Sequence, residues 1–82
     1  MNQQEEVSRQ VHQMHTYLND VARSTDGPGA SKPGTHNFEK RASAHRYLKS
    51  EAQRIMSQFP HSAWVHEQSY LEMWANSEGY RG

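Results

Sequence analysis

The stretch that decides the fold is residues 7–21, VSRQVHQMHTYLNDV, because its apolar residues recur in alternating steps of four and three. This spacing places them on one narrow stripe of a helix, as in the a and d positions of a heptad repeat. The stripe consists of Val7, Val11, Met14, Leu18 and Val21. We therefore expect a helix over residues 2–23, with Asn2 as its cap. The stripe must be covered by the next helix, by another copy of the chain or by a partner.

Residues 24–36 form the predicted connection to a second helix. Within residues 26–34 there are three glycines and two prolines, a density that neither a helix nor a strand tolerates. The second helix is expected over residues 37–59, with Asn37 as its cap, and it ends before Pro60.

The second helix carries a similar stripe at the same spacing, which we call its seam, but this seam contains both apolar and polar residues. It is apolar in its C-terminal half, whereas Arg41 and His45 interrupt it in the N-terminal half. A shorter third helix is expected over residues 62–76, capped by Ser62. Residues 77–82 have no periodicity and are expected to fray.

The sequence thus predicts an all-α fold, an antiparallel helical hairpin with a third helix, as a single domain over residues 1–82. Only ten of the 82 residues are Leu, Ile, Val or Phe, so the core is thin and a homo-oligomer is expected to support it. The formal net charge is zero and there is no cysteine. No apolar run reaches the ~18 residues of a membrane span, and residues 1–6 do not resemble a signal peptide. A cytoplasmic protein is expected.

Charge is unevenly distributed, with a net charge of −2 over residues 1–26, +4 over residues 27–58 and −2 over residues 59–82. Cations and the free amides at the start of the second helix meet at the loop end of the hairpin, an arrangement that attracts phosphate or carboxylate groups. The hypothetical anion site comprises Lys32, Thr35, His36, Asn37, Lys40, Arg41, His45 and Tyr17. Alternatively, Asp20, Asp26 and Glu39 neutralise these cations on a solvated surface.

Six histidines are present, but none lies in a metal-binding motif, and we expect no metal ion and no cofactor. His12 and His15 are close enough on one helix to share an ion, but exposed or core-satisfied histidines are the favoured explanation. His45 lies in a seam, so its protonation should destabilise the fold below neutral pH.

The sequence contains no spacing typical of a nucleophile with its base, or of a paired general acid and base, so an enzyme is not expected. The favoured interpretation is a small binding protein of accessory, adaptor or inhibitor type that acts by protein–protein interaction. The residues assigned to a partner or an oligomer are Val7, Val11, Met14, Leu18, Trp64 and Trp74. For the two tryptophans, a place in the core of the single chain is the favoured alternative.

Two other functions remain open. One is an oligomer that holds a nucleotide or other phosphate compound at the loop end. The other is nucleic-acid binding through the basic residues of the second helix, which are Lys40, Arg46, Lys49 and Arg54.

Overall fold

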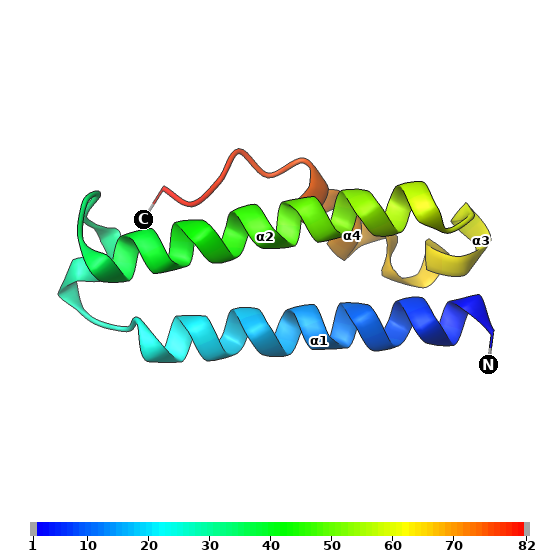
Figure 1. Ribbon diagram of the computed structural model, residues 1–82, viewed down its shortest axis with the longest axis horizontal. Coiled ribbons are helices and arrows are strands. Elements are labelled where there is room, and N and C mark those ends of the chain that lie inside the picture. The colour runs from blue at the N-terminus through cyan, green and yellow to red at the C-terminus, as the bar shows by residue number, and fades with distance from the viewer. Residues whose placement is uncertain (1, 82) are drawn as a thin grey trace.

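The computed structural model describes residues 2–81 and confirms the all-α hairpin, with no strand in that range. Two long helices lie antiparallel along the 42 Å axis of the molecule, and the C-terminal third of the chain folds back over one face of the pair (Figure 1). In chain order the elements are α1 (Gln3–Ser24), η1 (Pro28–Ser31), α2 (His36–Gln58), α3 (His61–Trp64), η2 (Val65–Glu67) and α4 (Gln68–Ala75).

The start of α1 agrees with the sequence prediction. The Asn2 side chain accepts a hydrogen bond from the backbone N–H of Glu5, at 2.8 Å, and satisfies one of the free amides of the first turn. Glu5 and Glu6 add negative charge at the positive end of the helix dipole.

The start of α2 differs from the prediction, because the cap is Thr35 and not Asn37. Thr35 is in an extended conformation, and its hydroxyl accepts from the N–H of Phe38 at 3.2 Å. The O–H of the same side chain points to the carbonyl oxygens of Gly29 and Lys32, both of which are within hydrogen-bonding distance as acceptors. The cap is therefore selected by the fold of the preceding loop, which closes onto Thr35.

The expected third helix over residues 62–76 is broken into α3, η2 and α4. Ser62 does not cap it: α3 begins at His61, and Pro60 precedes it without a side-chain cap. Trp64 leaves the helical conformation, with φ −127° and ψ 14°, and its indole N–H donates to the carbonyl of Phe59 at 3.2 Å. The break lets Ala63 and Leu71, on different pieces, both bury against the hairpin.

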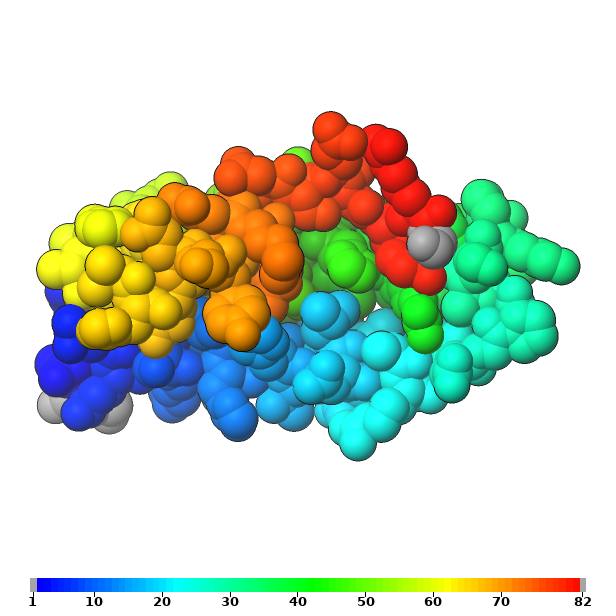
Figure 2. All heavy atoms as spheres, turned by 180° about the vertical axis from the view of Figure 1, so that it is seen from behind, coloured from blue at the N-terminus to red at the C-terminus, as the bar shows by residue number. Residues whose placement is uncertain are grey.

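The core lies between the hairpin and this broken segment. Seen from behind, α3 and α4 cover the hairpin, with α3 packed on α1 and α4 packed on α2 (Figure 2). The stripe of α1 is therefore covered within its own chain. The buried cluster consists of Val7, Val11, Met14, Leu48, Ala52, Ile55, Ala63, Leu71, Trp74 and Ala75.

Residues 77–81 have no regular secondary structure, yet they run back along α2 toward the loop (Figure 1). The ring of Tyr80 packs against Phe38 and His45, and its hydroxyl donates to the carbonyl of Ala30 at 2.9 Å. The expectation of a fraying tail did not anticipate these contacts, since periodicity cannot reveal a side chain that docks from outside a helix. Gly82 lies outside the described residues.

None of the helices between residues 2 and 81 has the length and apolar character needed to cross a membrane.

Candidate functional site

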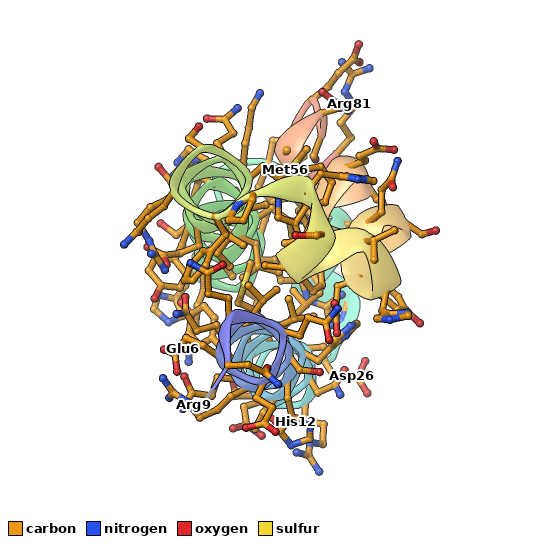
Figure 3. All side chains as sticks on the ribbon, turned by 90° about the vertical axis from the view of Figure 1, so that its right-hand side faces the viewer. Glu6, Arg9, His12, Asp26, Met56 and Arg81 are labelled. Carbon is orange, nitrogen blue, oxygen red and sulfur yellow. The ribbon has the colours of Figure 1, made fainter. Side chains whose placement is uncertain are left out.

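The face of the hairpin opposite α3 and α4 carries an open groove between α1 and α2. Viewed from one end, α3 and α4 lie on one side of the two long helices, and Glu6 and Arg9 lie on the other (Figure 3). The groove has a volume of about 580 Å³, within the range of ligand and peptide sites. It is lined by Arg9, Gln10, Gln13, Met14, Tyr17, Tyr47, Glu51 and Arg54.

An aromatic pair forms one part of this groove. The rings of Tyr17 on α1 and Tyr47 on α2 meet edge to face, with centroids 5.3 Å apart. The two residues are 40% and 51% exposed, although each ring has a large apolar surface. Met14, which belongs to the buried core, also lines the groove. The groove thus exposes aromatic surface continuous with the core.

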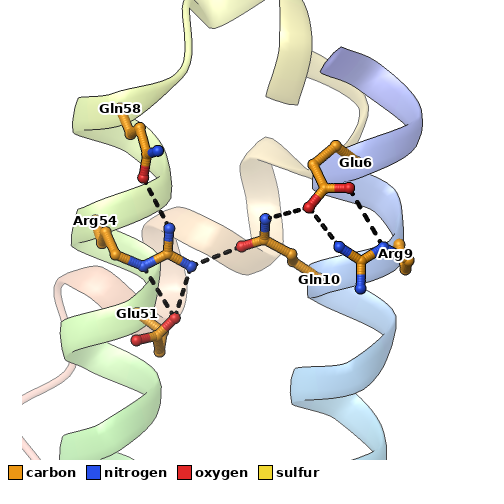
Figure 4. Close-up of polar contacts among 6 residues, drawn as sticks. All are labelled: Glu6, Arg9, Gln10, Glu51, Arg54 and Gln58. Atoms are coloured by element: carbon orange, nitrogen blue, oxygen red, sulfur yellow. Dashed lines mark hydrogen bonds and ion pairs between the residues drawn. The ribbon is translucent and has the colours of Figure 1, made fainter. Parts of the chain in front are cut away.

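A hydrogen-bonded chain of charged and amide groups spans the groove toward its other end (Figure 4). Arg54 on α2 donates to the Glu51 carboxylate at 2.7 Å and to the Gln10 amide oxygen, across the groove, at 2.6 Å. Gln10 in turn donates to Glu6 at 2.9 Å, and Glu6 forms an ion pair with Arg9. Two cations and two carboxylates balance here, so this part of the groove is polar but electrically neutral.

The hydrogen bond from Gln10, followed by that from Arg9, lowers the pKa of Glu6 below its ordinary value. Both contacts favour the ionised carboxylate. The Glu6 carboxylate is therefore ionised at neutral pH.

The two principal cations of the predicted anion site are already engaged with protein groups. Arg41 donates to the Thr25 hydroxyl at 2.6 Å and to the Ala22 carbonyl at 2.9 Å, which fastens α2 to the end of α1. Lys40 donates to the Ser24 hydroxyl at 3.1 Å. Of the three acidic residues in the alternative, Asp20 pairs with Arg23 and not with a cation of this site.

The other residues of that hypothesis are dispersed. Thr35 caps α2, while Lys32 and His36 are exposed. Asn37 is half-buried on the first turn of α2. Tyr17 lies in the groove and not at the loop end. The structure therefore does not bring the eight residues together around one ligand.

The six residues assigned to a partner lie in or against the core of the monomer. Val7, Val11, Met14 and Trp74 are buried, and Leu18 and Trp64 are partly buried against them. Their side chains are thus covered within one chain, and Met14 alone among them lines the groove. A heptad stripe shows that a surface is covered but not by which helix, so the sequence left the covering element open.

The basic residues of α2 do not form one surface. Lys49 donates to the carbonyl of Ser77 in the C-terminal segment, at 2.9 Å, whereas Arg54 belongs to the groove. Lys40 binds Ser24 on α1. The basic residues predicted to form one face of α2 therefore lie against three different parts of the molecule: the C-terminal segment, the groove and the end of α1.

Three of the six histidines, His15, His45 and His61, lie beside aromatic rings. His15 meets Tyr70 and Trp74 edge to face, at 4.5 and 4.8 Å between centroids. His45 stacks on Tyr80, and burial, followed by the charge of Arg41, lowers the pKa of His45 below 6.5. Across residues 2–81, no group of three or more potential ligands is placed to hold a metal ion.

The protein is thus a small helical hairpin that is covered on one face by a third, broken helical segment. The groove lies on the opposite face of the hairpin. Compared with protein-family models, with curated proteins and with solved structures, the chain matches none of them. The functional interpretation therefore depends on the groove itself.

Sequence reasoning singled out Met14, Tyr17 and Arg54 among the residues that line the groove, and assigned all three to other sites. One available signal was the spacing of Arg9, Gln13 and Tyr17, which places three long side chains in one row of α1.

Proposed function

We propose that this protein is a small non-enzymatic binding protein, of accessory, adaptor or inhibitor type, that acts by protein–protein contact through the α1–α2 groove. We further propose that a second copy of the chain binds this face, giving a homodimer. The observation that carries the proposal is the exposed Tyr17–Tyr47 pair beside Arg9 and Arg54. Tyr and Arg are the residue types that contribute most to binding energy at protein interfaces.

Charge supports a second copy as the occupant. The polar end of the groove balances Glu6 and Glu51 against Arg9 and Arg54, so two such faces do not repel each other. The whole chain is also neutral, which removes the long-range repulsion that keeps many proteins monomeric.

The size of the hairpin face is also compatible with a second copy of the chain as the occupant. The Cα atoms extend over 42 by 21 Å in the plane of the hairpin, the view of Figure 1. A standard interface needs about 800 Å² per partner, and a face of these dimensions can supply that area.

A nucleotide or phosphate ligand is the second candidate, and the contacts favour it less. Arg41 and Lys40 would have to give up their bonds to Thr25 and Ser24 before they could bind an anion. Nucleic-acid binding is weaker still, since the basic residues of α2 are divided among several surfaces. We place the protein in the cytoplasm, where a chain without cysteine loses no disulfide.

Sedimentation velocity over a concentration series tests the proposal. We expect the wild type to dimerise, and we expect Tyr47→Ala to weaken the dimer at least tenfold, the loss typical of an interface hot spot. Tyr47 is half exposed in the monomer, so the helix content should not change.

Met73→Ala is the matched control. Met73 is 58% exposed on α4, outside the groove, and its truncation should leave the association unchanged. A wild type that stays monomeric at the highest concentration, or a Met73→Ala variant as weak as Tyr47→Ala, would contradict the proposal. Native mass spectrometry of the purified protein reports the same stoichiometry, and a retained nucleotide would favour the second candidate.

A further inference from the structure

The segment after α4, residues 76–81, crosses α2 and is held there by side chains; we refer to it as the strap. Its main anchor is Tyr80, whose ring stacks on His45 with centroids 5.4 Å apart and an interplanar angle of 25°. The same ring lies 5.1 Å from that of Phe38. The Tyr80 hydroxyl donates to the carbonyl of Ala30 in η1 and accepts from Arg41, at 3.4 Å.

A second anchor lies nearer to α4. Lys49 donates to the carbonyl of Ser77 at 2.9 Å, and Gln53 donates to the carbonyl of Ala75, at the end of α4, at 3.1 Å. Phe38, Arg41, His45 and Lys49 follow one another in steps of three and four, so they share one face of α2.

The strap has little internal structure to keep it in place. It has no helix or strand, and Gly79 has a φ of 101°, in the region that favours glycine. Its docking therefore depends mainly on the bonds and ring contacts made by α2 and η1. Segments held by so few contacts open at a small free-energy cost compared with the core.

The charges around His45 are unfavourable to a proton on its ring. Arg41, one turn earlier on α2, already places its guanidinium carbon 5.9 Å from the centroid of the Tyr80 ring. An imidazolium at His45 would lie next to the like charge of the Arg41 guanidinium, which opposes its protonation. Lys49 adds a further positive charge on this face of α2.

No compensating carboxylate is provided by the strap. Its one acidic residue, Glu78, forms an ion pair with Arg81 at 2.6 Å, and both side chains are about three-quarters exposed. From η1, the neighbour of Tyr80 is the uncharged carbonyl of Ala30. Within residues 2–81, His45 takes part in no ion pair, so neutral imidazole is the form that fits the docked strap.

We infer that the strap is a pH-sensitive latch, docked on α2 while His45 is neutral and released when His45 binds a proton. Release exposes His45 to water and uncovers Phe38, while Arg41 keeps its bonds to Thr25 and Ala22 on α1. The coupling is reciprocal, so undocking the strap must make His45 easier to protonate.

The direction of the effect follows from the lowered pKa of His45, caused first by burial and then by Arg41. The docked state binds a proton less readily than the open state, where the pKa returns toward 6.5. Docking is therefore at its full strength above pH 6.5 and weakens as the pH falls below that value. The strap contains none of the groove-lining residues, so a test of the latch is independent of a test of the proposed dimer.

Proton NMR of the full chain, from about pH 8 to about pH 5.5, tests the latch. In the wild type we expect the Tyr80 ring signals to lose the shifts caused by His45 and Phe38 as His45 titrates. The amides of residues 77–81 should exchange faster at low pH after correction for their intrinsic rates. In the His45→Gln variant the strap should stay docked over the whole range.

Tyr80→Ala gives a second and independent readout. Removing the ring should raise the pKa of His45 toward its ordinary value, and this outcome does not require the His45→Gln variant to fold. His12→Gln is the control, because His12 is exposed on α1, and this variant should behave as the wild type does. Tyr80 signals that do not change with pH, that change equally in His45→Gln, or a His45 pKa unaffected by Tyr80→Ala would overturn the latch.

Discussion

At the scale of single residues, the fold depends on one buried hydroxyl at the end of α1. Thr25 is fully buried, and it is the only buried polar or charged residue in the part of the chain that the structure describes. Its hydroxyl donates to the Val21 carbonyl and accepts from Arg41, both at 2.6 Å. One side chain thus closes α1 and receives the guanidinium that ties α2 to it.

We expect Thr25→Val to lower the free energy of unfolding by about 1–3 kcal/mol, because the partly buried Nε–H of Arg41 loses its acceptor while the volume stays nearly constant. Urea unfolding measures the loss. Ser24→Ala removes the neighbouring exposed hydroxyl, which accepts from Lys40, and should cost no more than about 0.5 kcal/mol. Equal losses in the two variants would show that burial of the hydroxyl is not the cause.

A second residue-scale prediction separates the cap seen in the structure from the cap expected from the sequence. Thr35→Ala should destabilise the protein by about 1 kcal/mol, since the Phe38 amide and the loop carbonyls lose their partner. Thr35→Ser should retain most of that stability. Asn37→Ala should change stability by less than about 0.5 kcal/mol, and a larger effect at Asn37 would restore it as the cap.

At the scale of elements, periodicity predicts the hairpin well. The stripe of Val7, Val11 and Met14 is buried as its spacing requires, and both long helices end within a few residues of their predicted limits. This success has a physical cause: an amphipathic helix is a local pattern, and burial of one face follows from it.

The third segment could not be predicted in the same way, because its form is set by contacts far away in the sequence. Gln4 on α1 donates to the Ser62 carbonyl at 3.0 Å, and Ser8 on α1 donates to Glu67 at 2.9 Å. These contacts hold α3 and η2 against α1, whereas local propensity alone favours a continuous helix.

The groove was missed for a related reason. A binding face is defined by what the rest of the chain leaves uncovered, and this depends on where α3 and α4 pack. Arg54 illustrates the point: the sequence marks it as a basic residue of α2, and only the structure shows that its guanidinium reaches across the groove to Gln10.

The packing of α4 gives an element-scale prediction. Leu71 is fully buried in the common core, so Leu71→Ala should lower the free energy of unfolding by about 2–5 kcal/mol. Met73→Ala, on the exposed side of the same helix, should cost less than about 0.5 kcal/mol. Urea unfolding followed by circular dichroism compares the two, and similar losses would mean that α4 does not dock through Leu71.

At the scale of the whole molecule, the composition predicts a thin core that a second copy of the chain is expected to support. Within one chain, α1 is covered by α2 and α3, and α4 closes the remaining side of α2. The proposed dimer therefore adds a contact at an already folded surface. Folding of the monomer should then be independent of protein concentration, whereas formation of the proposed dimer should depend on it.

This separation can be measured by dilution. We expect the urea midpoint, followed by circular dichroism, to stay constant over a hundredfold dilution of the protein, because the apolar stripe of α1 is buried in each chain. Sedimentation over the same range should register the dissociation of the dimer. If folding required the second copy, the same dilution would instead lower the apparent stability by about 2.7 kcal/mol. A midpoint that falls with dilution would thus show that the groove contact, and not α3 and α4 alone, completes the core.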